Sequence, residues 1–210
     1  MSIQKHLPRF FVIAGLVGAT LLGTACAPLV VGGAMVGGAL MATDRRTSGI
    51  QIEDQGIELK AGTRVREVLG DRGHVSINSY NRLVLITGEV DSEADRTAVE
   101  QAVSRVENVR NTFNELAVMG STSLTSRSND VIIRSKVKAS LIDAKDVMSN
   151  AFDLHVERAV VYLMGRVTER EATRATDIAR SVSGVQKVVQ VFEIISEAEL
   201  AEMLPKPKAQ

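Results

Sequence analysis

The segment LVLITGEV at residues 83–90 returns as VVYLMGRV at residues 160–167, and each copy is followed by a charged, alanine-rich stretch. The glycines at the matching positions, Gly88 and Gly165, are 77 residues apart. This spacing exceeds the roughly 20 to 45 residues of a solenoid repeat and suits a small domain. We therefore predict that the chain contains a tandem duplication of one small domain.

The first copy is predicted to contain a helix, a hairpin, a second helix and a last strand. Its first hairpin segment alternates apolar and polar side chains, as a half-buried strand does. Asp91 or Ser92 can cap the second helix, in which Ala94, Ala98 and Ala102 lie near one face. The expected strands are residues 74–80, 83–90 and 113–118, and the expected helices are residues 56–69 and 92–106.

The second copy shows the same order with clearer signals. Thr168 and Glu171 have the spacing of a capping box, and Gly184 is placed to end the helix that the box opens. The expected strands are residues 152–156, 160–167 and 185–195, and the expected helices are residues 130–143 and 168–183. Each unit is thus α-β-β-α-β. We predict an α+β fold in which two helices pack on one face of a small three-stranded mixed sheet.

The composition excludes one class of partner. The chain has 25 basic and 25 acidic side chains, so it has no net charge with which to attract nucleic acid in bulk. Aromatic residues make up only 3% of the chain and Trp is absent, so aliphatic side chains must build the cores. We expect no nucleic-acid partner.

The N-terminus has the order of a bacterial secretory signal. Basic residues precede an uncharged run from Phe10, and small residues at 23–25 precede Cys26, the only cysteine. A single thiol cannot form an internal disulfide. The arrangement resembles the lipobox of bacterial lipoproteins, which implies cleavage before Cys26 and acylation of its thiol and new amine. Ala27, rather than Asp, after the cysteine favours the outer membrane.

The uncharged run continues to Thr43 and is longer than the roughly 20 residues of a bilayer span, so a transmembrane anchor is the alternative. Pro28 and the spaced glycines beyond it favour a tether, although small residues could also pack a helix within the bilayer. The expected divisions are a signal at 1–25, a lipidated tether at 26–49, domains at 50–120 and 127–196 joined by a linker at 121–126, and a C-terminal tail at 197–210 that begins as a short helix.

Catalytic groups do not converge in the sequence. His74 and His155 lie at or beside the hairpin strands without a neighbouring cluster of ligands at metal spacing. No serine lies in a nucleophile elbow, and Glu169 and Glu171 suit the first turn of a helix better than acid–base work. We expect no enzyme activity, no metal and no cofactor.

The helix at residues 130–143 carries two apolar lines. Ile133, Val137 and Leu141 recur every four residues and form a stripe that packs on the sheet. Ile132, Ala139 and Ile142 form a second line, rotated by about 100° from the first. One face cannot bury both lines, so the second is a candidate binding surface.

Basic residues surround this second line. They are Arg134, Lys136 and Lys138, with Arg127 before the helix and Lys145 after it, opposed only by Asp130 and Asp143. Exposed aliphatics among basic groups suit the interface of an anionic bilayer. The alternative is that Ile132 and Ile142 pack against the first domain.

Residues 163–172 and 182–185 resemble the BON domain, and two such units behind a lipobox are similar to the DolP family of outer-membrane lipoproteins. The resemblance implies a periplasm-facing protein that supports envelope integrity, concentrates at division sites and meets outer-membrane assembly proteins. It implies that the first helix of the second BON domain binds phosphatidylglycerol or cardiolipin. The expected contacts are Ile132, Arg134, Lys136, Lys138, Ala139 and Ile142. The competing hypothesis is an adaptor that docks another envelope protein through this helix.

Overall fold

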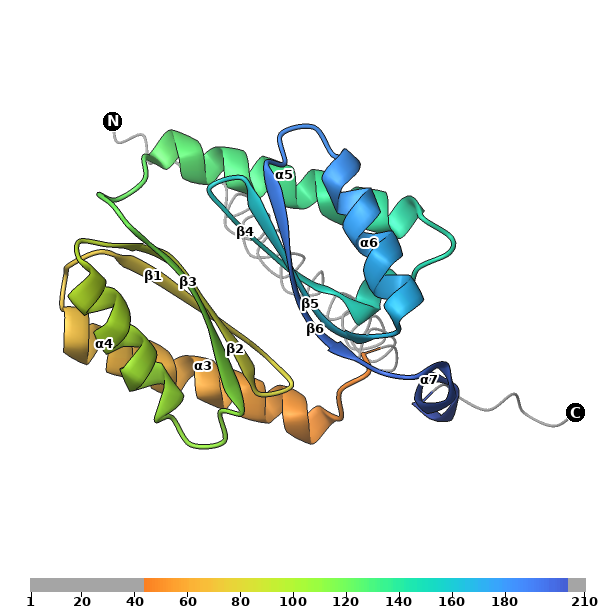
Figure 1. The fold of residues 1–210 in the computed structure, drawn as a ribbon, viewed down its shortest axis with the longest axis horizontal. Coiled ribbons are helices and arrows are strands. Elements are labelled where there is room, and N and C mark those ends of the chain that lie inside the picture. The colour runs from red at the N-terminus through yellow and green to blue at the C-terminus, as the bar shows by residue number, and fades with distance from the viewer. Residues whose placement is uncertain (1–43, 204–210) are drawn as a thin grey trace, which may run out of the picture. The chain divides into compact units, whose positions relative to one another are not determined.

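The computed structural model describes residues 44–203, which contain both copies of the repeat (Figure 1). The predicted signal, Cys26 and residues 27–43 of the tether lie outside the described residues, as do residues 204–210. The described residues belong to one compact unit that begins at Asp44. Among them, no helix combines the length and the apolar character that a membrane span requires.

Each copy has the predicted order of elements. The first comprises α3 (Ser48–Leu69), β1 (His74–Tyr80), β2 (Leu83–Val90), α4 (Glu93–Ser104) and β3 (Asn111–Val118). The second comprises α5 (Leu124–Asp143), the short 3-10 helix η1 (Ser149–Ala151), β4 (Asp153–Glu157), β5 (Val160–Val167), α6 (Glu169–Ser181) and β6 (Lys187–Ile194). The expected helical extension follows as α7 (Glu197–Met203).

The two sheets share one topology. In the order β1-β2-β3, the central β2 is antiparallel to β1 and parallel to β3, and β4-β5-β6 repeats this arrangement. The antiparallel pair is a hairpin, whereas the parallel pair needs the crossover that α4 or α6 supplies. The predicted α+β class with small mixed sheets is confirmed.

Helices cover one face of each sheet, as Figure 1 shows. Against the first sheet, α3 and α4 bury a cluster that includes Ile57, Val99 and Ile86. Against the second, α5 and α6 bury a cluster that includes Val137 and Leu163. Both cores are almost wholly aliphatic, as the composition predicted.

The other face of each sheet is also buried, because the two copies meet there. Tyr80 and Leu85 of the first copy form one cluster with Tyr162, Met164 and Val191 of the second. The central strands are thus covered on both faces, which explains why their sequences are nearly continuous apolar runs instead of alternating ones. The predicted domain has helices on one face of the sheet, and the structure adds a partner on the other.

The start of each first helix is tied to its hairpin turn by a buried aspartate. The Asp54 carboxylate in α3 accepts hydrogen bonds from the N–H groups of Asn81 and Arg82, at 2.8 and 2.7 Å. Asp130 in α5 accepts them from Arg158 and Ala159, at 2.9 and 2.8 Å. The turn residues all have positive φ, between 49° and 65°, as the tight turns that suit hairpins require.

Both first helices begin earlier than predicted. The predicted start of α3 at residue 56 is wrong, because the helix begins at Ser48 with Thr47 as its N-cap. The predicted start of α5 at residue 130 is likewise wrong, because Ser123 caps a helix that begins at Leu124. The added residues, 48–55 and 124–129, are mostly polar and have little apolar periodicity, so the pattern did not reveal them. The predicted tether boundary at residue 49 falls inside α3.

The predicted caps and the predicted end of α6 agree with the structure, but the predicted buried face of α4 does not. Ser92 caps α4, the Thr168–Glu171 capping box opens α6, and Gly184 has a φ of 99° just after α6 ends. However, α4 buries Val99 and Val103 instead of centring on its alanine row, because the larger side chains fill the space above the sheet.

Candidate functional site

The inward stripe of α5 is the predicted one. Ile133, Val137 and Leu141 are at most 1% exposed and belong to the core of the second copy. Asp130 shares this buried face and is fully engaged by the β4–β5 turn. Its negative charge therefore lies beneath the helix, away from the outer face.

The outward side of α5 carries the second line. Ile132 is 53% exposed, Ile142 is 61% exposed and Ala139 is exposed, so none of the three is buried against the first copy. The alternative in which Ile132 and Ile142 pack against the first domain is not seen. The structure adds Leu124 and Val131, which are 80% and 64% exposed. Leu124 was missed because the predicted helix began six residues too late.

The basic side chains of α5 have no counterions in the part of the chain that the structure describes. Within residues 44–203, none of its four cations lies within ion-pair distance of a carboxylate. Those cations are Arg127, Arg134, Lys136 and Lys138. Lys138 is half-buried and its Nζ donates to the Ser149 carbonyl at 3.2 Å, so it is less free than the sequence suggested.

The neighbouring helix α6 is the natural comparison. All three of its arginines pair with carboxylates, Arg170 with Glu197, Arg174 with Asp146 and Arg180 with Asp177. In α3, Lys60 pairs with Glu107 and Arg64 with Glu67. The positive charge of α5 is therefore a local property, although the whole chain is neutral.

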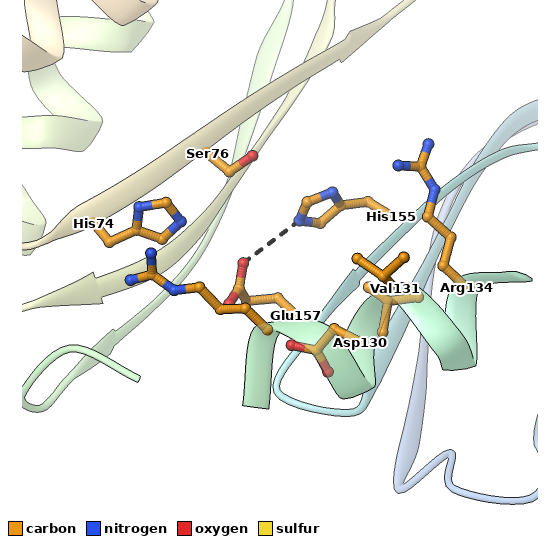
Figure 2. A pocket seen from close by; sticks show the side chains of 9 residues that line it. His74, Ser76, Asp130, Val131, Arg134, His155 and Glu157 are labelled. Atoms are coloured by element: carbon orange, nitrogen blue, oxygen red, sulfur yellow. Dashed lines mark ion pairs between the residues drawn. The ribbon is translucent and has the colours of Figure 1, made fainter. Parts of the chain in front are cut away.

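A pocket of about 220 Å³ lies beside α5, with walls from both copies (Figure 2). The first copy supplies His74 and Ser76 from β1. The second supplies Arg127, Asp130, Val131 and Arg134 from α5, and His155, Val156 and Glu157 from β4. Sequence reasoning placed each histidine on or beside a hairpin strand but missed that both line one pocket, because this depends on how the copies pack.

The histidine of β4 links the pocket to the first copy. His155 Nε2 lies 2.9 Å from Thr87 Oγ1 in β2 and 3.8 Å from Glu157 Oε2. Interaction with the imidazole lowers the pKa of the Glu157 carboxyl, and burial opposes this shift. Glu157 therefore stays ionised and is directed to the histidine. Within the described residues, no three His, Cys, Asp or Glu side chains are placed to hold a metal ion.

Polar contacts fix the two copies against each other around the apolar cluster. Glu193 of β6 accepts hydrogen bonds from Asn81 and Arg110 of the first copy and from Arg166 beside it, at 2.5, 3.2 and 3.1 Å. Arg45, which precedes α3, forms a bidentate salt bridge with Glu171 in α6. Its Nη1 and Nη2 each donate to one carboxylate oxygen at 2.7 Å. Because the pocket spans this interface, its shape depends on these contacts.

Comparison with known proteins agrees with this architecture. The BON domain family matches residues 59–120 and 129–196, one match in each copy. The outer membrane lipoprotein DolP of Haemophilus influenzae is 34% identical over 87% of this chain and 95% of its own. The chain belongs to the BON-domain family and, within it, to the DolP-like proteins that carry two BON domains.

Other matches cover less of the chain. A 21 kDa hemolysin of Actinobacillus pleuropneumoniae is 23% identical over 72% of this chain and 79% of its own. A solved structure of CdsD, a structural protein of the Chlamydia trachomatis type III secretion system, aligns with 67% of this chain and 95% of its own at 9% identity. Its TM-score is 0.28.

Proposed function

We propose that this protein is a non-enzymatic lipoprotein of the outer membrane that binds anionic phospholipid through α5. Acyl groups on Cys26 hold the chain at the inner leaflet, and both BON domains face the periplasm. Phosphatidylglycerol and cardiolipin are the ligands. The name of the H. influenzae relative supports the location. Support of envelope integrity, at division sites, is the cellular role that we attach to this binding.

One observation carries the lipid proposal: exposed aliphatics and uncompensated cations share the outer side of α5. Leu124, Val131, Ile132 and Ile142 are all more than half exposed. A helix that lies in a membrane interface combines such side chains with Lys and Arg. The apolar groups enter the boundary between headgroups and acyl chains, while the cations meet phosphate.

The magnitudes suit an anchored protein. Each basic residue near an anionic surface contributes about 1 kcal/mol, and each buried methylene about 0.8 kcal/mol. Two or three basic residues together with two or three buried methylenes give only weak binding when the domain is not anchored. An anchor raises the local concentration of lipid to the order of millimolar or more, at which weak contacts are occupied. Lipid binding through α5 therefore orients a tethered protein more than it recruits one.

Co-sedimentation with vesicles tests the proposal. Residues 26–210 carrying Cys26→Ser lack the acyl anchor, so sedimentation reports binding by the domains. We expect more protein with phosphatidylglycerol vesicles than with phosphatidylcholine vesicles. Ile132→Glu and Ile142→Glu should abolish the difference with little change in melting temperature, since both side chains are exposed. Equal sedimentation with both lipids would refute the lipid role.

The first copy offers a matched control. Ile52 and Leu59 of α3 are 70% and 74% exposed, but the basic residues around them are partly paired. Ile52→Glu makes the same chemical change on a surface outside the proposed site and should leave sedimentation unchanged. The competing adaptor role predicts instead that a photo-crosslinker at position 132 captures one dominant envelope protein, independent of lipid composition.

A further inference from the structure

We infer that the pocket between β1, β4 and α5 is a binding subsite for a phosphodiester, occupied by the headgroup phosphate of a phospholipid held at α5. The inference rests on the proposed function and specifies where the headgroup binds. Neither the BON-domain match nor the relatives' names assign a role to this pocket.

The pocket contains the donors that a phosphate group needs. Arg127 and Arg134 reach it from α5, where they lie seven residues or about two turns apart, and they have no carboxylate within ion-pair distance among residues 44–203. Guanidinium groups bind phosphate through paired N–H donors. The Ser76 hydroxyl and two imidazoles supply further donors from the β-strands.

The two carboxylates in the wall do not make this a cation site. Both oxygens of Asp130 accept backbone N–H groups from the β4–β5 turn. Glu157 faces His155, and Figure 2 shows that contact within the pocket. A cation would find neither carboxylate free, and the described residues hold no suitable group of metal ligands. An anion is the ligand whose charge the remaining groups complement.

The size and position of the pocket match a headgroup. Its volume, about 220 Å³, is below the roughly 300 to 1,000 Å³ of sites for drug-sized ligands, so it suits a small polar group. Val131 and Arg134 line the pocket and are also exposed on α5. One phospholipid can therefore place its phosphate in the pocket and its apolar part beside Val131 and Ile132.

The test uses residues 26–210 with Cys26→Ser and the soluble headgroup glycerophosphoglycerol, followed by isothermal calorimetry and the imidazole signals in NMR. We expect binding that shifts the His74 and His155 signals, because both side chains line the pocket. Arg134→Gln and Arg127→Gln should each weaken it about tenfold, the value of a hydrogen bond between charged groups. Arg64→Gln removes the same charge from an exposed pair in α3, outside the pocket, and should leave headgroup affinity unchanged.

The outcomes separate this subsite from the function itself. If phosphatidylglycerol vesicles bind but the headgroup does not, or if Arg64→Gln weakens headgroup binding as much as Arg134→Gln, the subsite is refuted and the lipid role stands. If the headgroup binds at the pocket but vesicles do not, the subsite stands as a soluble phosphodiester site and the lipid role fails. Binding of inorganic phosphate without glycerophosphoglycerol would overturn the headgroup assignment.

Discussion

Arg158 of the second BON domain donates from Nη1 to the Glu89 carboxylate of the first at 3.0 Å, and also to the Gly88 carbonyl at 2.8 Å. Glu89 is completely buried, whereas Arg158 is about one-fifth exposed. A carboxylate without access to water depends on its partner. The pair therefore holds the two domains in one arrangement, and the pocket beside α5 depends on that arrangement.

Removal of Arg158 should destabilise the folded protein. Arg158→Ala leaves the Glu89 carboxylate buried and unpaired, which costs about 3 to 5 kcal/mol. Chemical denaturation of residues 26–210 measures the loss. The control is Arg64→Ala, which breaks an exposed pair with Glu67 and should cost less than about 1 kcal/mol. Similar losses for the two variants would show that the domain interface does not bury this charge.

Arg45 and Glu171 should contribute to stability in a manner that depends on pH. Burial acts to raise the pKa of Glu171, but hydrogen bonds from Arg45 and from the Thr168 N–H outweigh it, so the folded pKa lies below the ordinary 4.5. A lowered folded pKa means that the stabilisation is present above the unfolded value and is lost as the pH falls through the folded one.

The stability difference between the parent chain and Arg45→Gln should thus be full near neutral pH and should shrink below about pH 4.5. Denaturant titrations at a series of pH values measure it. Arg180→Gln, in an exposed pair with Asp177, is the control and should show little difference at any pH. A constant difference for Arg45→Gln would contradict the assigned pair.

The tyrosines should report whether the domains remain packed. Burial raises the pKa of Tyr80 to about 12, and burial likewise raises that of Tyr162 to about 12. Both lie in the cluster between the sheets, and they are the only tyrosines in the chain. Ultraviolet titration should therefore show no tyrosinate near pH 10 in the folded protein, and ionisation at the ordinary pKa of about 10 in denaturant. A folded-state transition near pH 10 would mean that the sheets separate in solution.

Two glycines should respond oppositely to the same substitution. Gly88 has a φ of 119°, and a Cβ there would collide with the His74 carbonyl oxygen on the neighbouring strand. Gly88→Ala should cost several kcal/mol because backbone would have to move. Gly56 lies inside α3 with open space around a Cβ, so Gly56→Ala should stabilise by about 0.5 to 1 kcal/mol. Thermal unfolding measures both, and a neutral Gly88→Ala would contradict the strand pairing.

The predicted features that the structure confirms are those governed by local chemistry. The capping box at Thr168, the inward stripe of α5 and the order of strands each follow from side chains near one another in sequence. The starts of α3 and α5 were not predicted, because local chemistry does not mark them. Their first turns lack apolar periodicity, and what ties these helices to their hairpins is a distant contact, from Asp54 or Asp130 to a turn nearly thirty residues later.

Sequence alone determined that the chain contains two α-β-β-α-β domains with aliphatic cores. The reason is that apolar periodicity depends on residues close in sequence and that the repeat is visible when the two segments are compared. Only the tertiary structure decided which faces remain exposed and which residues meet. Packing of the sheets placed His74 and His155 in the wall of one pocket and buried Glu89 against Arg158. Within residues 44–203 it left the α5 cations without counterions. The physical reason is that burial and charge pairing depend on distances in space, which residue spacing along the chain does not encode.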